Sequence, residues 1–215
     1  MADTPPTEDL NLKMQQMTDA RLARLRQVAQ NRQRGIMVMM EDVHNVHNLS
    51  AIARSCDAFG IQQVAFSMED EDLFDPTLQG NITSASASKW LDYRIFHQGT
   101  THALTTLKAE GWHLLATVMA DDAVSMYTLD FSQPRFDKLV VLVGNEREGL
   151  SQTAMNLADT RMTIPMQGMI QSFNVSVAAA LTLFEVSRQR MASDRDYLLD
   201  DAAKEALFLD FVARA

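Results

Sequence analysis

The sequence predicts an α/β protein in which helices flank a parallel sheet, with further helical extensions at both ends of the chain. Short apolar runs alternate with longer segments in which apolar residues recur at helical spacing. This alternation is typical of β–α units, because each helix returns the chain so that the next strand runs parallel to the last. Hydrophobic residues make up 47% of the 215 positions, which is enough for a core, and no internal repeat or low-complexity segment interrupts the pattern.

The elements follow from the periodicity in chain order. The apolar runs predict strands at residues 36–40, 63–67, 93–96, 112–119, 139–143 and 161–164. Helical spacing predicts helices at residues 18–34, 49–59, 100–110, 151–158, 173–190 and 200–213. Asn48 is the expected N-cap of the second helix, Gly60 its stop signal, and Ser151 the N-cap of the fourth helix. The polar segment 1–12 is expected to be disordered, and residues 68–89 to form a long irregular connection.

Charge is distributed unevenly along the chain. The net charge of −9 and the pI near 4.9 argue against a general nucleic-acid binder. Residues 13–34 nevertheless hold six basic side chains against one acid, Asp19. Phosphate binding depends on local potential, so this segment is either an RNA-binding arm or a solvated helix face. The arginines that would contact RNA are Arg21, Arg24, Arg26, Arg32 and Arg34.

The single cysteine, Cys56, excludes an internal disulfide and indicates a reducing compartment. The amino terminus has neither the basic nor the apolar stretch of a signal peptide. No apolar run approaches the roughly 20 residues that span a bilayer. We therefore expect a cytoplasmic protein that does not act at a membrane.

Three segments combine small, polar and turn-forming residues at the places where strands lead into helices. They are HNLSAIARSCDAFG at 47–60, VLVGNEREGL at 141–150 and IPMQGMIQSFNVSVA at 164–178. In the third segment, Ser172 and Asn174 precede an apolar helix, where they can cap the helix or face a ligand.

Together and in this order, the three segments resemble the SpoU (TrmH-like) family of RNA ribose 2′-O-methyltransferases, in the SPOUT class. The family patterns are N-x5-R, G-x-E-x-x-G-[IL] and I-P-M-x-G-x-x-x-S-L-N-V-S-x-A. This chain matches every signature position except one, where Phe173 replaces leucine. The resemblance covers about residues 21–190. It implies a SPOUT domain at 36–191 with a trefoil knot at about 139–190, preceded by a basic segment at 1–35 and followed by an acidic tail at 192–215.

The resemblance also implies roles for five polar residues, each with a structural alternative. Arg54 matches the catalytic arginine, which acts as a base or as a phosphate clamp, although a surface arginine is usually just solvated. Asn48 would place the arginine and the substrate, or simply cap its helix. Glu146 would order the active-site loops, or be an exposed loop acid. Ser172 and Asn174 would lie beside the substrate ribose and phosphate, or cap the last long helix.

The cofactor implied by the resemblance is S-adenosylmethionine, held by Thr117, Gly144, Ile164, Met169 and Phe173. For Met169 and Phe173, plain core packing is the alternative. No metal is expected. His44 and His47 lie beside Asp42, but no further ligands follow at a suggestive spacing.

For the substrate, the resemblance points to RNA and, within the family, most closely to enzymes that methylate the guanosine at position 18 of tRNA. A ribosomal RNA or another tRNA position is the enzymatic alternative, since the short acidic tail departs from those tRNA enzymes. A non-catalytic RNA-binding factor on the same fold is the alternative from another class. The apolar helix at 173–190 implies a homodimer, because family members pack this helix against its mate.

Overall fold

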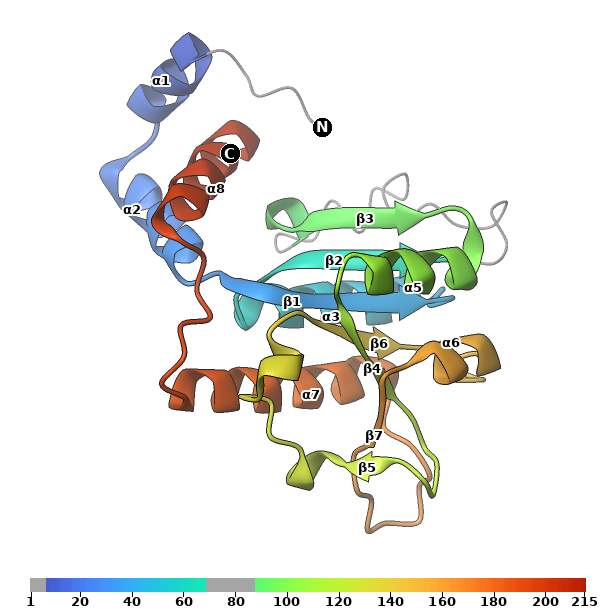
Figure 1. Ribbon diagram of the computed structural model, residues 1–215. Helices are drawn as coiled ribbons and strands as arrows, with labels where there is room; N and C mark the ends of the chain where they lie inside the picture. The colour runs from blue at the N-terminus through green and yellow to red at the C-terminus, as the bar shows by residue number, and fades with distance from the viewer. Residues whose placement is uncertain (1–6, 69–87) are drawn as a thin grey trace. The chain divides into compact units, whose positions relative to one another are not determined.

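The computed structural model describes residues 7–68 and 88–215, which form two compact units (Figure 1). One unit contains the chain up to Arg34 together with Leu198–Ala215, and the other is Gly35–Tyr197. None of the helices in the described residues is long and apolar enough to cross a membrane.

The larger unit is built on a seven-stranded sheet with the order β3-β2-β1-β6-β4-β7-β5. The pairs β1–β6, β2–β3, β4–β6, β4–β7 and β5–β7 are parallel, which confirms the predicted sheet. The strands are β1 (Gln33–Glu41), β2 (Ile61–Ser67), β3 (Asp92–Phe96), β4 (His113–Thr117), β5 (Val124–Ser125), β6 (Leu139–Val143) and β7 (Thr160–Thr163). The sequence did not predict β5, because two residues are too short to show an alternating pattern.

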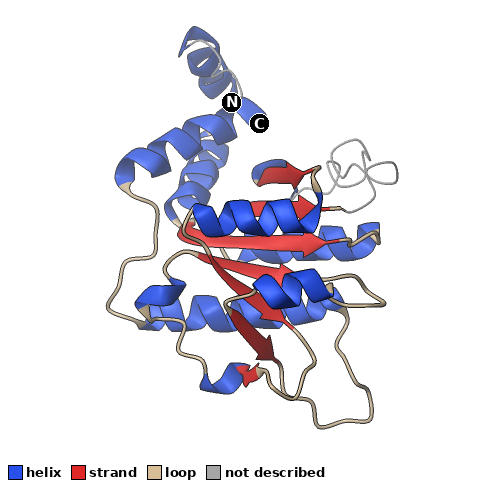
Figure 2. Ribbon diagram, turned by 45° about the vertical axis from the view of Figure 1, so that its right-hand side comes forward, coloured by secondary structure: helices blue, strands red, loops and turns tan. Residues whose placement is uncertain are grey.

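Helices cover both faces of this sheet (Figure 2). Helices α3 (Val46–Ala58) and α7 (Val175–Ala192) bury their apolar faces in one core, and α5 (Gly99–Ala109) and α6 (Gln152–Leu157) in the other. Strand β6 is buried at every position, and its side chains alternate between the two cores. Burial on both faces explains why this strand reads as a continuous apolar run. Among the described residues of this unit there are also three short 3-10 helices, η1 (Ser88–Trp90), η2 (Met126–Thr128) and η3 (Pro134–Phe136).

The smaller unit consists of α1 (Thr7–Gln16), α2 (Asp19–Gln30) and α8 (Asp201–Arg214). The expectation of disorder at residues 1–12 is wrong from Thr7 onward, where α1 begins, and residues 1–6 lie outside the described part. The basic and acidic segments are not independent extensions, since α2 and α8 pack together. Apolar side chains of both helices are buried, among them Leu25 on α2 and Phe211 on α8.

Two of the arginines predicted to contact RNA are engaged within this unit. Arg32 is 0% exposed and its guanidinium lies 5.6 Å from the ring centre of Phe211, so it is a core residue and not a phosphate contact. Arg26 pairs with Glu205 at 2.5 Å and covers the ring of Phe208. The sequence prediction failed because α2 ends at Gln30, so that Arg32 lies beyond this helix and not within it as predicted, and because local sequence does not show that Phe211 of α8 lies against it.

Candidate active site

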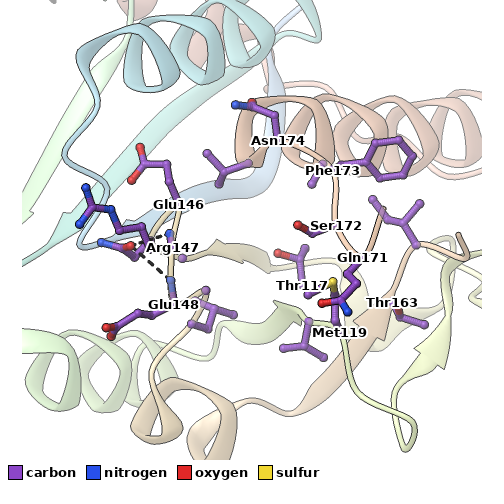
Figure 3. A pocket seen from close by; sticks show the side chains of 18 of the residues that line it. Thr117, Met119, Glu146, Arg147, Glu148, Thr163, Gln171, Ser172, Phe173 and Asn174 are labelled. Carbon is purple, nitrogen blue, oxygen red and sulfur yellow. Dashed lines mark hydrogen bonds between the residues drawn. The ribbon is translucent and has the colours of Figure 1, made fainter. Parts of the chain in front are cut away.

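A pocket of about 470 Å³ lies at the ends of β4, β6 and β7. Its lining comes from residues 117–119, from the loop 144–150 that follows β6, and from the segments around 162–166 and 171–175 between β7 and α7. Figure 3 shows Glu146, Arg147 and Glu148 on one side of the pocket and Thr117, Gln171 and Ser172 on the other. Ligands of open α/β sheets bind outside the carboxyl ends of the strands, and the volume suits a small molecule.

The loop after β6 is tightly closed, and its two glycines permit this. A Cβ atom on Gly144 would lie 2.2 Å from the backbone carbon of Gly149, so no larger residue fits. Gly149 itself has a φ of 75°, which favours glycine. Asn145 and Gly149 exchange two backbone hydrogen bonds of 2.9 Å, and the Asn145 side chain accepts from the backbone N–H of Arg147 at 2.8 Å. Gly144 is therefore required by close backbone approach, and Gly149 by its left-handed backbone conformation.

Helix α3 is capped by Asn45 and not by Asn48, which corrects the sequence prediction. The Asn45 side chain accepts hydrogen bonds from the backbone N–H groups of His47 and Asn48, at 2.9 and 3.4 Å. Both asparagines suit a cap and lie three residues apart, so local sequence could not decide between them. The consequence is that the Asn48 amide is available for contacts with other segments.

Those contacts join all three motifs in one hydrogen-bonded relay, Glu146–Asn48–Asn174. Asn48 donates to the Glu146 carboxylate at 2.9 Å and accepts from the Asn174 amide at 3.1 Å. Asn174 is the N-cap of α7, because its side-chain oxygen accepts from the backbone N–H of Ser176 at 2.9 Å. The Glu146 carboxylate also accepts from the backbone N–H of Asn45 at 3.2 Å. The relay thus links the starts of α3 and α7 to the loop after β6.

The relay favours an ionised Glu146. Partial burial would raise the pKa of this carboxyl, but hydrogen bonds from the Asn48 amide and from the backbone N–H groups of Glu146, Asn45 and His44 outweigh it. The net effect holds the pKa of Glu146 below its usual range. An ionised carboxylate can only accept hydrogen bonds, so the Asn48 side-chain nitrogen must face Glu146. The Asn48 side-chain oxygen is then left to accept from Asn174.

Most of the residues predicted to hold the cofactor do line the pocket. Thr117, Gly144, Ile164 and Phe173 belong to its wall, and the Thr117 hydroxyl donates to the backbone oxygen of Leu142 at 2.8 Å. Ser172 also lines the pocket, and since Asn174 caps α7, Ser172 is not the cap of that helix. This geometry leaves the Ser172 hydroxyl beside the pocket, where a ligand can reach it.

Three predicted site residues do not line the pocket. Asn48 is connected to it only through its hydrogen bonds with the lining residues Glu146 and Asn174. Met169 is fully exposed on the loop between β7 and α7 and does not line the pocket. Arg54 is exposed on α3 and is likewise absent from the lining. At 100° per residue, Arg54 lies about 120° around the helix from Asn48, so the two side chains leave α3 in different directions.

The pocket wall also contains residues that the sequence did not predict, among them Met119, Arg147 and Gln171. Arg147 stands inside the second motif, beside Glu146, and that adjacency was the available signal. Gln171 likewise stands inside the third motif, directly before Ser172, whereas Met119 carries no local signal and is brought to the pocket by the fold.

Comparison with known proteins identifies the family. The family model described as SpoU rRNA Methylase family matches residues 35–184. This chain belongs to that family. It is 40% identical over 178 residues to the tRNA (guanosine(18)-2′-O)-methyltransferase of Thermus thermophilus, with 83% of this chain and 87% of that protein covered.

Solved structures support the same assignment. The TrmH/SpoU tRNA modifying enzyme of A. aeolicus matches with a TM-score of 0.77 at 30% identity, covering 91% of this chain and 96% of that chain. An AdoMet-bound rRNA methyltransferase from Sinorhizobium meliloti matches with a TM-score of 0.60 at 26% identity, over 76% of this chain and 59% of that chain. The SpoU-family protein described here is a methyltransferase, and its cofactor is S-adenosylmethionine.

The pocket fits this cofactor. Its volume of about 470 Å³ is in the range of small-molecule sites, and its wall mixes apolar side chains with polar groups, as an adenosine and an amino-acid chain require. The wall includes the acids Glu146 and Glu148, which suit a sulfonium cation. Gly144, which has no side chain, lines the pocket with backbone alone.

Proposed function

We propose that this enzyme transfers a methyl group from S-adenosylmethionine to the ribose 2′-hydroxyl of the guanosine at position 18 of tRNA. The observation that carries the proposal is the complete Glu146–Asn48–Asn174 relay at the pocket of a chain closely similar to a tRNA guanosine-18 methyltransferase. The substrate is taken from that relative and from the tRNA modifying enzyme of A. aeolicus. A tRNA substrate is available in the cytoplasm, where we place the reaction.

In this proposal, Thr117, Gly144, Ile164 and Phe173 hold the cofactor, which supplies an electrophilic methyl group when bound. The relay fixes the position of α7 relative to the loop after β6, so that Ser172 and Asn174 present polar groups to the substrate ribose and its phosphate. A methyl transfer between a sulfonium and a hydroxyl requires positioning and a path for the hydroxyl proton, and no metal enters the scheme.

We assign Arg54 the role of phosphate clamp. A guanidinium offers a planar fork of hydrogen-bond donors and no acceptor, so Arg54 is better suited to hold an anion than to remove a proton. It lies on an exposed face of α3, where RNA can reach it from outside the pocket. The fork of donors matches a phosphate and can also offset negative charge that develops on the ribose oxygen.

We further propose that two copies associate through α7. Phe184 on this helix is 52% exposed and packs edge-on against Phe59 of α3, and Val177 and Met191 are exposed as well. Exposed large apolar side chains on a helix favour a partner surface.

We also propose that residues 139–190 form the trefoil knot expected for the family. Support for the knot comes from the match of residues 35–184 to the family model.

The tRNA surface in this proposal includes Arg21, Arg24 and Arg34, which are exposed in the smaller unit. Arg26 contributes less, because it is paired with Glu205. Arg32 is excluded, because it is buried. Contacts from arginines to RNA phosphates hold the RNA without reading its sequence. They would therefore position the tRNA and leave the choice of nucleotide to the pocket.

The test is methyl transfer to unmodified tRNA, followed by mapping of 2′-O-methyl groups by mass spectrometry. We expect one methyl group per tRNA, at guanosine 18, and none on a tRNA that carries a 2′-deoxyguanosine there. A methyl group at another tRNA position, or transfer only to ribosomal RNA, would overturn the substrate assignment. A wild-type protein that binds S-adenosylmethionine and RNA but transfers no methyl group would favour a non-catalytic RNA-binding factor.

A further inference from the structure

Glu41 is a buried acid that the proposed chemistry does not use. It is the last residue of β1, and 2% of it is exposed. Its two carboxylate oxygens accept from the backbone N–H of Ser151 at 2.8 Å and from the Ser151 hydroxyl at 2.6 Å. Burying a carboxylate costs free energy, and hydrogen bonds offset that cost without making such a residue a good source of stability. The presence of a buried glutamate here is therefore better explained by a role in holding Ser151 in place than by a contribution to stability.

The neighbouring residue holds the other end of the same loop. The backbone oxygen of Asp42 accepts from the Asn145 side chain at 2.9 Å. Asp42 has a φ of 48°, a left-handed conformation that non-glycine residues adopt at a cost and that aspartate tolerates better than most. Glu41 and Asp42, the β1 clamp, therefore hold Ser151 and Asn145, the two ends of the loop that lines the pocket.

The clamp acts on backbone that the cofactor would contact. The residues between its two anchor points, 146–150, all line the pocket. Ser151 is also the N-cap of α6, and its hydroxyl accepts from the backbone N–H of Ala154 at 3.0 Å. A shift of Ser151 would therefore move both Leu150 at the pocket wall and the start of α6.

We infer that Glu41 is a positioning residue for S-adenosylmethionine, which holds the loop 145–151 in the shape that the cofactor binds. This inference rests on the proposed function of the pocket. Glutamine at position 41 keeps the size of the side chain, but it replaces one acceptor oxygen with a donor nitrogen. It can then serve only one of the two Ser151 donors well, so the loop loses one of its fixed points.

The experiment compares wild type, Glu41→Gln and Ser151→Ala with Glu185→Gln as the matched control. Glu185 is another hydrogen-bonded carboxylate, on α7 and outside the pocket lining, where it bonds Arg188 and Gln189. Calorimetry measures the affinity for S-adenosylmethionine and S-adenosylhomocysteine. Hydrogen exchange of the cofactor-free protein measures the protection of amides 145–151. Turnover is measured at saturating cofactor.

We expect Glu41→Gln to weaken cofactor binding about tenfold, a difference of about 1.4 kcal/mol. Exchange at 145–151 should rise, while turnover at saturating cofactor stays within about twofold of wild type. Ser151→Ala should shift the same readouts in the same direction, and the double variant should add little, because the two residues form one contact.

The inference is overturned if wild type binds the cofactor and Glu41→Gln binds it equally well, or if exchange rises throughout the sheet and not in the loop. An equal loss in Glu185→Gln would also overturn it. A wild-type protein that does not bind S-adenosylmethionine would instead refute the proposed function of the pocket.

Discussion

The pocket and the smaller unit use polar side chains in opposite ways. Beside the pocket, Asn48 bonds to both Glu146 and Asn174 from a distant part of the chain, so each side chain has a fixed orientation. In the smaller unit, Arg21 and Arg24 lie on the exposed surface of α2, and Arg26 is paired with Glu205 on a neighbouring helix. The first arrangement supplies geometry, and the second supplies charge. Changes in the pocket should therefore act on turnover, and changes in the smaller unit on RNA affinity.

The largest expected effect is that of Asn48→Leu. Leucine has a similar size but can bond to neither Glu146 nor Asn174, so the relay is broken at its centre. We expect the rate of methyl transfer to fall at least about 100-fold, which corresponds to about 2.7 kcal/mol in the barrier. Asn156→Leu is the control, since Asn156 bonds Gln152 on α6 outside the relay. Single-turnover rates check the prediction, and a loss below about fivefold would show that the relay is not needed.

Arg54 tests this difference between the two regions, because it is exposed like the arginines of α2 but is proposed to act on the reaction. Arg54→Ala should lower turnover by about 100-fold with tRNA affinity changed less than about threefold. Arg54→Lys should fail almost as badly, since an ammonium cannot replace the planar fork. The matched control is Arg188→Ala, another exposed arginine, on α7. If tRNA affinity falls as far as turnover does, Arg54 belongs with the charge-supplying surface.

A smaller effect is expected from the arginines of α2. The double variant Arg21→Glu/Arg24→Glu should weaken tRNA binding about tenfold at low salt and leave cofactor affinity unchanged. The slope of the logarithm of tRNA affinity against the logarithm of salt concentration should become shallower by about 0.7–0.9 for each phosphate contact removed. Arg24→Gln should weaken binding more than Arg26→Gln, because the Arg26 guanidinium is already paired with Glu205. Equal losses from these two single variants would show that the ion pair opens when RNA binds.

The smallest effect concerns pH. The pKa of Glu146 lies below its ordinary value of 4.5, so its contribution to stability is complete above that value and is lost as the pH falls through the lowered pKa. The difference in free energy of unfolding between wild type and Glu146→Gln should therefore be constant from neutral pH to about 5 and shrink below it. Urea denaturation at a series of pH values measures this difference. A difference that grows toward low pH would contradict an ionised Glu146 in the relay.

Local sequence predicted the parallel sheet and the positions of the three motifs well. Strand β6 is a continuous apolar run because both of its faces are buried. The run can be recognised from the five residues alone, without knowing which strands lie beside it. Gly60 ends α3 with a φ of 72°, and Ser151 caps α6 as predicted. In each case the physical cause acts within a few residues of the position that was predicted.

The wrong predictions concern residues whose surroundings depend on segments distant in the chain. Asn45 and Asn48 are equally suited to cap α3, and the contacts of Asn48 with Glu146 and Asn174 are made across about a hundred residues of chain. Arg32 was predicted to meet RNA, but α8 covers it. Met169 was expected in the cofactor site from the family resemblance, but it is fully exposed and does not line the pocket.

By itself, then, the sequence determined the order of the longer strands and helices apart from α1, the glycines of the closed loop after β6, and a set of motifs specific enough to indicate the family. Those features follow from backbone geometry and from apolar periodicity, which are local. Only the tertiary structure decided which polar groups meet. It assembled the relay, excluded Arg32 from the RNA surface and set Glu41 against Ser151. Hydrogen bonds form only between groups within about 3 Å, and that proximity is set by the whole fold and not by spacing along the chain.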